Sequence, residues 1–168
     1  MEPILTSRLV IRKFRVDDAG FILELLNQPS FHEHIGDRGI RTRDQAILYL
    51  WQGPMSCYHV KGWGLFCVTL EDRPIGMCGL VQRIIFDDPD LGFAFLPEYW
   101  GQGYAYEACH GVIEYSREYL ELPRLLAIVA PENSTSLKLL DRLGFVYKHM
   151  VRMDEDQPDI KLLALELA

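Results

Sequence analysis

The segment LGFAFLPEYWGQGYAYEA, Leu91 to Ala108, carries the most informative pattern in this 168-residue chain. Its first six residues are apolar, as in a buried strand, and Pro97 marks a turn after them. Gly101 and Gly103 have no Cβ, so backbone amides there can come close to a ligand. The loop enters a helix whose first amides lack partners, and such a helix start attracts anions, phosphate groups above all. The segment therefore predicts a strand, an anion-binding loop and a helix.

The elements around this segment are strands and one further helix. The runs WGLFCVTL at 63–70 and PIGMCGLVQRIIF at 74–86 are rich in β-branched and aromatic residues. Together with 91–96 they predict three consecutive antiparallel strands. An apolar stripe predicts a helix over 105–120, and RLLAIVA at 124–130 predicts a strand buried on both faces. Strand, helix and strand in this order predict a right-handed parallel crossover.

The N-terminal third is expected to supply one strand and two helices. Alternating residues predict a strand over 5–14, and AGFILELLN predicts a helix over 19–27. Residues 30–41 show neither period and predict a loop or a broken helix. A capping box at Thr42 opens the second helix, which Gly53-Pro54 is expected to stop.

The C-terminal third predicts one helix and two closing strands. Asn133 is placed to cap a helix over 134–143 that Gly144 ends, and the strands cover 145–153 and 160–168. No internal repeat or linker interrupts the chain. We therefore expect a single domain, residues 1–168, of the mixed α/β (α+β) class, with helices on both faces of a mostly antiparallel sheet.

The composition is that of a soluble globular protein. Hydrophobic residues make up 49% and charged residues 24%, and no apolar run is long enough to span a bilayer. The N-terminus lacks the pattern of a secretion signal, so a cytoplasmic protein without membrane contact is expected. The four cysteines form no CxxC pair, which argues against a zinc site or a disulfide framework. A net charge of −7 disfavours nucleic-acid binding and suits a cationic substrate such as an amine.

A Gly-x-Gly loop before a helix also occurs in Rossmann dinucleotide sites. In that case the third glycine would fall at Tyr106, and the loop would follow an early parallel strand. Here the loop follows three strands that are linked as hairpins, so the pattern argues against a Rossmann site.

The order of elements resembles the GNAT superfamily of acyl-CoA-dependent N-acetyltransferases over nearly the whole chain. WGQGYA at 100–105 is similar to the pyrophosphate loop of that family, with Trp100 in place of the usual Arg or Gln. Asn133–Ser136 opening a helix and Leu143–Phe145 closing it are also similar. The opening TSRLVIRKF points to a branch similar to ribosomal-protein alanine N-acetyltransferases.

This resemblance implies acetyl-CoA as the donor cosubstrate and no metal. In the family, the pantetheine arm lies between two splayed parallel strands, which correspond here to 91–96 and 124–130. A backbone amide of the first strand polarises the acetyl carbonyl. The resemblance assigns a set of residues to the cofactor: Phe95, Leu96, Trp100, Gly101, Gln102, Gly103, Tyr104, Ala105, Tyr106, Asn133 and Ser136. A further candidate is Arg142, a cation that is expected to contact the 3′-phosphate of coenzyme A.

Direct transfer to an amine needs a proton acceptor and a donor for the departing thiolate. Many family members use a tyrosine as the acid, at the position of Leu140 here, and the branch that this chain resembles has a serine that matches Ser136. We therefore expect Ser136 to be the acid. Asp90, before the cofactor strand, is the first candidate for the base, with Asp88, Glu98 or a water chain as alternatives.

The acceptor side is less specified than the donor side. Family members use the loop after the first helix for the acceptor, which points to Phe31, His32 and His34. The acceptor is expected to be a protein N-terminus or a small amine, and the protein to be a monomer or homodimer. Because Leu140 replaces the usual tyrosine, the alternative is a non-catalytic sensor or scaffold that binds acyl-CoA.

Overall fold

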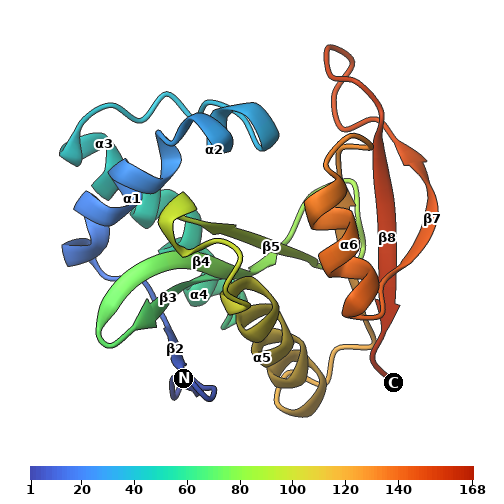
Figure 1. Ribbon diagram of the computed structural model, residues 1–168, viewed down its shortest axis with the longest axis horizontal. Helices are drawn as coiled ribbons and strands as arrows, with labels where there is room; N and C mark the ends of the chain where they lie inside the picture. Colours follow the sequence, from blue (N-terminus) through green and yellow to red (C-terminus); the bar gives the residue numbers. More distant parts are fainter.

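The computed structural model describes all residues, 1–168, and forms one eight-stranded sheet with helices packed against it (Figure 1). The strand order is β1-β2-β3-β4-β5-β6-β8-β7, and only β5 and β6 are parallel. The strands are β1 (Ile4–Leu5), β2 (Leu9–Arg12), β3 (Leu65–Leu70), β4 (Arg73–Val81), β5 (Asp90–Phe95), β6 (Arg124–Val129), β7 (Val146–Val151) and β8 (Ile160–Glu166). The expected mixed sheet with one parallel crossover is confirmed.

Helices lie on both faces of the first five strands, as expected. They are α1 (Ala19–Leu26), α2 (Pro29–His34), α3 (Arg43–Leu50), α4 (Ser56–Lys61), α5 (Tyr104–Glu118) and α6 (Ser134–Arg142). Side chains of α4, α5 and α6 belong to the larger core cluster, and those of α1, α2 and α3 to the smaller one. The alternation along β3 explains this division, because Phe66 and Val68 enter the larger cluster and Cys67 the smaller.

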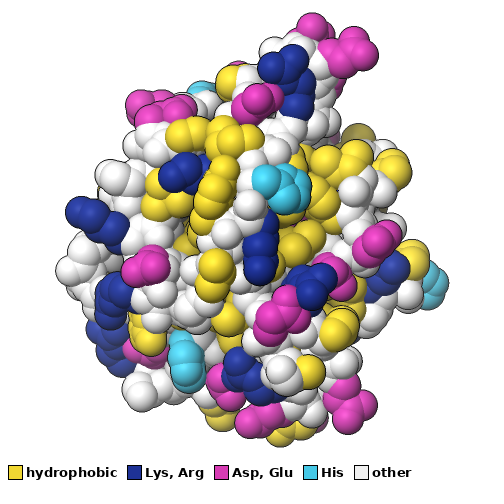
Figure 2. Space-filling view, turned by 90° about the vertical axis from the view of Figure 1, so that its right-hand side faces the viewer, with side chains coloured by type: hydrophobic (Ala, Val, Ile, Leu, Met, Phe, Trp, Pro, Cys, Tyr) yellow, Lys and Arg dark blue, Asp and Glu magenta, His cyan; other side chains and the backbone are white.

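The last three strands have a helix on one face only. The sheet face away from α6 carries a small apolar cluster of Leu126, Leu162 and Ala164, with Phe86 and Val151 packed against it. No helical residue belongs to this cluster. Figure 2 views the molecule from the side that carries β7 and β8, and it shows hydrophobic side chains there with Lys, Arg and His side chains among them.

Strands β5 and β6 form a fork. Asp90 and Leu126 are their only facing pair, and the amide of Leu126 donates to the carbonyl of Pro89 at 2.9 Å. Each strand pairs along its full length with its other neighbour, β5 with β4 and β6 with β8. The fork is therefore held open by the pairings on its two outer sides.

Three expectations about element boundaries were wrong. Gly53-Pro54 does not end a helix: the chain continues through the π-helical turn η2 (Trp51–Met55) and α4 to Gly62, which has φ 81°. Proline has no backbone N–H and so cannot donate the usual helical hydrogen bond. The wider π-helical turn allows the helix to continue past it. The strand predicted over 74–86 ends at Val81, and the strand predicted over 5–14 is the hairpin of β1 and β2.

No helix in the chain is both long and apolar enough to cross a membrane.

Candidate functional site

The inner edge of β5 has backbone groups that face the open fork. The amide of Leu96 donates to the carbonyl of Ile75 in β4 at 3.0 Å, so it is occupied. In an antiparallel pair, adjacent residues turn their amides to opposite sides, so the amide of Phe95 faces β6. The indole of Trp100 donates to the carbonyl of Phe95 at 2.9 Å. Of the two amides expected to bind the thioester, only that of Phe95 is directed into the fork.

The glycine loop is shaped by two residues with positive φ. Gly101 has φ 73° and Gly103 has φ 85°, a region that side chains with a Cβ rarely adopt. Gly103 is the N-cap of α5, whose first intrahelical bond runs from the amide of Glu107 to the carbonyl of Gly103 at 3.0 Å. The amides of residues 104–106 precede this bond and have no helical partner. The loop and helix start therefore present a concentrated set of free donors for an anion.

The start of α6 provides a second group of polar atoms. The side-chain oxygen of Asn133 accepts a hydrogen bond from the amide of Ser136 at 3.3 Å, so Asn133 caps the helix. The half-buried hydroxyl of Ser136 forms no hydrogen bond within the chain. The hydroxyl of Ser116, in contrast, is tied to the carbonyl of Val112 at 2.8 Å. Ser136 thus keeps a donor available for a ligand.

Leu140, one turn after Ser136, is fully buried in the larger core cluster. Phe145 and Leu163 belong to the same cluster, so the position serves packing in this chain. The side chain of Leu140 therefore provides no polar atom that could act as an acid.

Asp90 lies at the closed end of the fork. It is 2% exposed, and the Nε of Arg83 donates to its carboxylate at 2.9 Å. Burial raises the pKa of Asp90, although the charge and hydrogen bond of Arg83 oppose the shift. Five residues of extended strand, about 16 Å, separate Asp90 from Phe95. This placement argues against direct contact between Asp90 and an amine at Phe95, and it favours a role in holding the fork.

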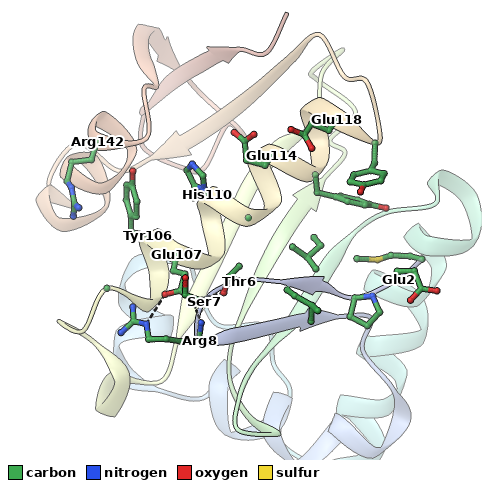
Figure 3. Close-up of a pocket in the computed structure, with 18 residues that line it drawn as sticks. Glu2, Thr6, Ser7, Arg8, Tyr106, Glu107, His110, Glu114, Glu118 and Arg142 are labelled. Carbon is green, nitrogen blue, oxygen red and sulfur yellow. Dashed lines mark hydrogen bonds and ion pairs between the residues drawn. The ribbon is translucent and has the colours of Figure 1, made fainter.

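Arg142 and Tyr106 connect α6 with the first turn of α5. The guanidinium of Arg142 lies 4.6 Å from the ring centroid of Tyr106, and the ring of His110 stacks on the same tyrosine. They line one end of a groove of about 1050 Å³ between α5 and the N-terminal hairpin (Figure 3). An exposed cation near the free amides of α5 suits a phosphate of a bound ligand.

The three residues expected at the acceptor side have different surroundings. Phe31 is buried in the smaller core cluster, to which Leu96 also belongs. The Nε2 of His32 is buried without a hydrogen bond, 3.7 Å from the Oδ1 of Asp37, and His34 is exposed. A hydrogen bond from Arg41 and another from the amide of Gly39 lower the pKa of Asp37 to about 2. Only His32 combines partial burial with a free polar atom.

Sequence reasoning missed the residues that hold the glycine loop from the N-terminal side. Arg8 and Thr6 both bond the carboxylate of Glu107 on α5, from about a hundred residues away. No local pattern connects residues at this separation, and only the hairpin of β1 and β2 brings them together.

Comparison with known proteins agrees with the fold. Residues 8–146 match the family described as the acetyltransferase (GNAT) domain. The chain is 28% identical over 156 residues to an uncharacterised N-acetyltransferase p20 of Bacillus licheniformis, covering 90% of this chain and 86% of that protein. It is 29% identical over 151 residues to the [ribosomal protein uS5]-alanine N-acetyltransferase of Escherichia coli, covering 83% and 76%. A ribosomal L7/L12 alpha-N-protein acetyltransferase, solved with coenzyme A, superposes with a TM-score of 0.87 at 14% identity, covering 99% and 98%.

Proposed function

Because this chain belongs to the GNAT family and is an N-acetyltransferase that uses acetyl-CoA as donor, we propose that it acetylates a primary amine by direct transfer in the β5–β6 fork. The observation that carries this proposal is the fork itself, with one free strand edge and a loop of free amides at its mouth. The amine nitrogen attacks the acetyl carbon, the carbon–sulfur bond breaks, and the coenzyme A thiolate leaves.

The donor would be held by three groups of residues. The free amides from Gly101 to Tyr106 suit the pyrophosphate, since backbone N–H groups at a helix start bind phosphate without a cationic side chain. Arg142 suits the 3′-phosphate, and Asn133 the pantetheine arm. The amide of Phe95 would donate to the acetyl oxygen, where negative charge develops during attack.

Ser136 would donate its hydrogen to the departing thiolate. Its hydroxyl is free, half-buried and at the start of the helix that follows β6. We assign no residue to the base: Asp90 is too far along the strand for direct contact, and the amine would lose its proton to water in the fork.

The acceptor that we favour is a protein N-terminus. A relative at 29% identity bears the name of a ribosomal-protein alanine N-acetyltransferase, and it covers 83% of this chain. The second candidate is a small amine such as an amino acid or a polyamine. The half-buried His32 follows Phe31 on α2, whose core cluster includes Leu96, and it would lie near either acceptor.

Thiol release from acetyl-CoA tests the proposal. Purified protein would be given alanine- and serine-starting peptides, free amino acids and polyamines, and liberated thiol would be measured. Release that depends on peptide is expected. Release with free amines alone would favour the small-amine acceptor. Binding of acetyl-CoA without thiol release from any amine would favour the sensor or scaffold, for which the buried Leu140 is the supporting observation.

A further inference from the structure

We propose that Arg8, from the turn between β1 and β2, is a positioning residue that holds the glycine loop in its phosphate-binding shape. The inference rests on the proposed function, since it concerns how the loop meets the donor. Arg8 would hold the loop by binding one of its backbone carbonyl groups, and it would not touch the reacting atoms.

Four contacts join Arg8 to the loop and to the first turn of α5. Its Nη1 donates to the carbonyl of Gln102 at 3.0 Å, and its Nε donates to Glu107 at 2.7 Å. Its backbone amide donates to the other oxygen of Glu107 at 2.8 Å, and its guanidinium lies 4.4 Å from the ring centroid of Tyr104. Figure 3 shows Arg8 reaching from the hairpin to Glu107. Arg8 thus holds both the loop and the helix that follows it.

The bond to Gln102 determines where the next amide points. The carbonyl of Gln102 and the N–H of Gly103 belong to one planar trans peptide group, so they point in opposite directions. With the carbonyl bound to Arg8, the N–H of Gly103 is directed away from Arg8. This orientation presents the amide to an anion on the opposite side of the loop.

The same side chain also limits what residue 103 can be. A Cβ at Gly103 would lie 3.2 Å from the Nη2 of Arg8, which is closer than ordinary van der Waals contact. The positive φ already favours glycine there. Two constraints therefore favour glycine at position 103: the positive φ of the backbone and the nearby side chain of Arg8.

The negative charge of Glu107 adds an electrostatic effect to its contact with Arg8. Its carboxylate lies in the first turn of α5, next to the free amides, and would repel a bound phosphate. Arg8 and the hydroxyl of Thr6, which donates to Glu107 at 2.5 Å, both compensate this charge. Bracing of the loop and neutralisation of Glu107 are separable by mutation.

Three variants, compared with wild type, separate these effects: Arg8→Met, Glu107→Gln and the double variant. Titration calorimetry with acetyl-CoA should show that Arg8→Met raises Kd at least about tenfold, and kinetics should show KM rising more than kcat falls. If bracing dominates, as proposed, the double variant stays weak. Recovery of wild-type affinity in the double variant would overturn the bracing and leave Arg8 as a counter-charge.

Arg117→Met is the matched control. Arg117 lies at the other end of α5 and, like Arg8, bonds a carboxylate, that of Glu114, and a backbone carbonyl, that of Leu167. Its side chain is 38% exposed, against 43% for Arg8. Arg117→Met should leave the Kd for acetyl-CoA unchanged. An equal rise in Kd for both variants would mean a general effect on α5 and would overturn the inference.

Nuclear magnetic resonance relaxation of the ligand-free protein tests the role of Arg8 independently of the proposed function, because it needs no acetyl-CoA. The amide order parameters of Gly101 and Gly103 should fall from about 0.85 in wild type toward about 0.6 in Arg8→Met, with no change in Arg117→Met. Unchanged order parameters would overturn the bracing even if acetyl-CoA binds. If wild type binds no acetyl-CoA, the proposed function fails, while the order parameters still decide whether Arg8 holds the loop.

Discussion

Asp90 and Leu126 are the only residues that face each other between β5 and β6, and the two strands diverge beyond them. Strand β5 remains paired with β4, and β6 remains paired with β8. Both strands therefore stay in the sheet although they diverge from each other. The free edge of β5 ends at Phe95, and the indole of Trp100 bonds its carbonyl. The fork and the glycine loop therefore form one continuous site.

Replacing Gly103 should weaken donor binding more than replacing Gly101. Gly103→Val places a branched side chain at φ 85° against Arg8, whereas Gly101→Ala meets no heavy atom within 4 Å and carries only the backbone strain. Calorimetry with acetyl-CoA should give a Kd at least about tenfold higher for Gly103→Val, equivalent to about 1.4 kcal/mol. Equal affinity in both variants would contradict the steric argument.

Ser136→Ala should lower kcat and leave KM for acetyl-CoA nearly unchanged. Loss of a general acid lowers the rate about 100-fold or more. Ser116→Ala is the matched control, because that hydroxyl is bonded to its own helix and is fully buried. Steady-state kinetics check both variants. If Ser136→Ala turns over at the wild-type rate, Ser136 is not the acid.

Asp90→Asn should lower the free energy of unfolding and leave the pH dependence of kcat/KM unchanged. Removing the charge leaves Arg83 without its ion pair at the closed end of the fork, at a cost of about 1–3 kcal/mol in the free energy of unfolding. The acidic limb of the kcat/KM–pH profile should persist, since about 16 Å of strand separates Asp90 from an amine at Phe95. Urea unfolding and the pH profile measure the two effects. Disappearance of the acidic limb would restore Asp90 as the base.

Leu140→Tyr should destabilise the protein without raising kcat. The position is fully buried, so a larger side chain with a hydroxyl overpacks the core at a cost of about 1–3 kcal/mol. For a chain of this length each kcal/mol lowers Tm by about 2–4 °C. Thermal unfolding and thiol release are the measurements. A stable variant with faster turnover would show that the position reaches the fork.

Acid should weaken the fold through Asp18. Burial alone would raise the pKa of Asp18, but hydrogen bonds from the side chain of Arg12 and the amide of Arg15 outweigh it and hold the pKa below its ordinary value. The pair therefore stabilises the fold above the unfolded pKa of about 3.9, and this contribution is lost as pH falls through the lower folded pKa.

Asp18→Asn tests this dependence by urea unfolding at several pH values from about 5 downward. Its free energy of unfolding should fall less with acid than that of wild type. Asp17→Asn is the control, because Asp17 is exposed and forms no side-chain hydrogen bond. An identical acid response in wild type and Asp18→Asn would exclude the Arg12–Asp18 pair as the cause.

Local patterns in the chain were sufficient for most elements. The capping box at Thr42, the cap at Asn133 and the parallel crossover from β5 to β6 are present as predicted. The failure at Gly53-Pro54 has a tertiary cause, since Pro54 is buried within a helix that continues to Lys61. Packing there outweighs the local tendency of proline to end a helix.

By itself, the sequence determined most of the elements and the position of the glycine loop, because a strand, two glycines and a helix start are neighbours along the chain. Only the tertiary structure decided which groups are free: the amide of Leu96 is used by β4, that of Phe95 faces the fork, and Leu140 is core. It also brought Arg8 to Glu107 across the hairpin. Hydrogen-bond partners and burial depend on residues far apart in sequence, so no local pattern contains them.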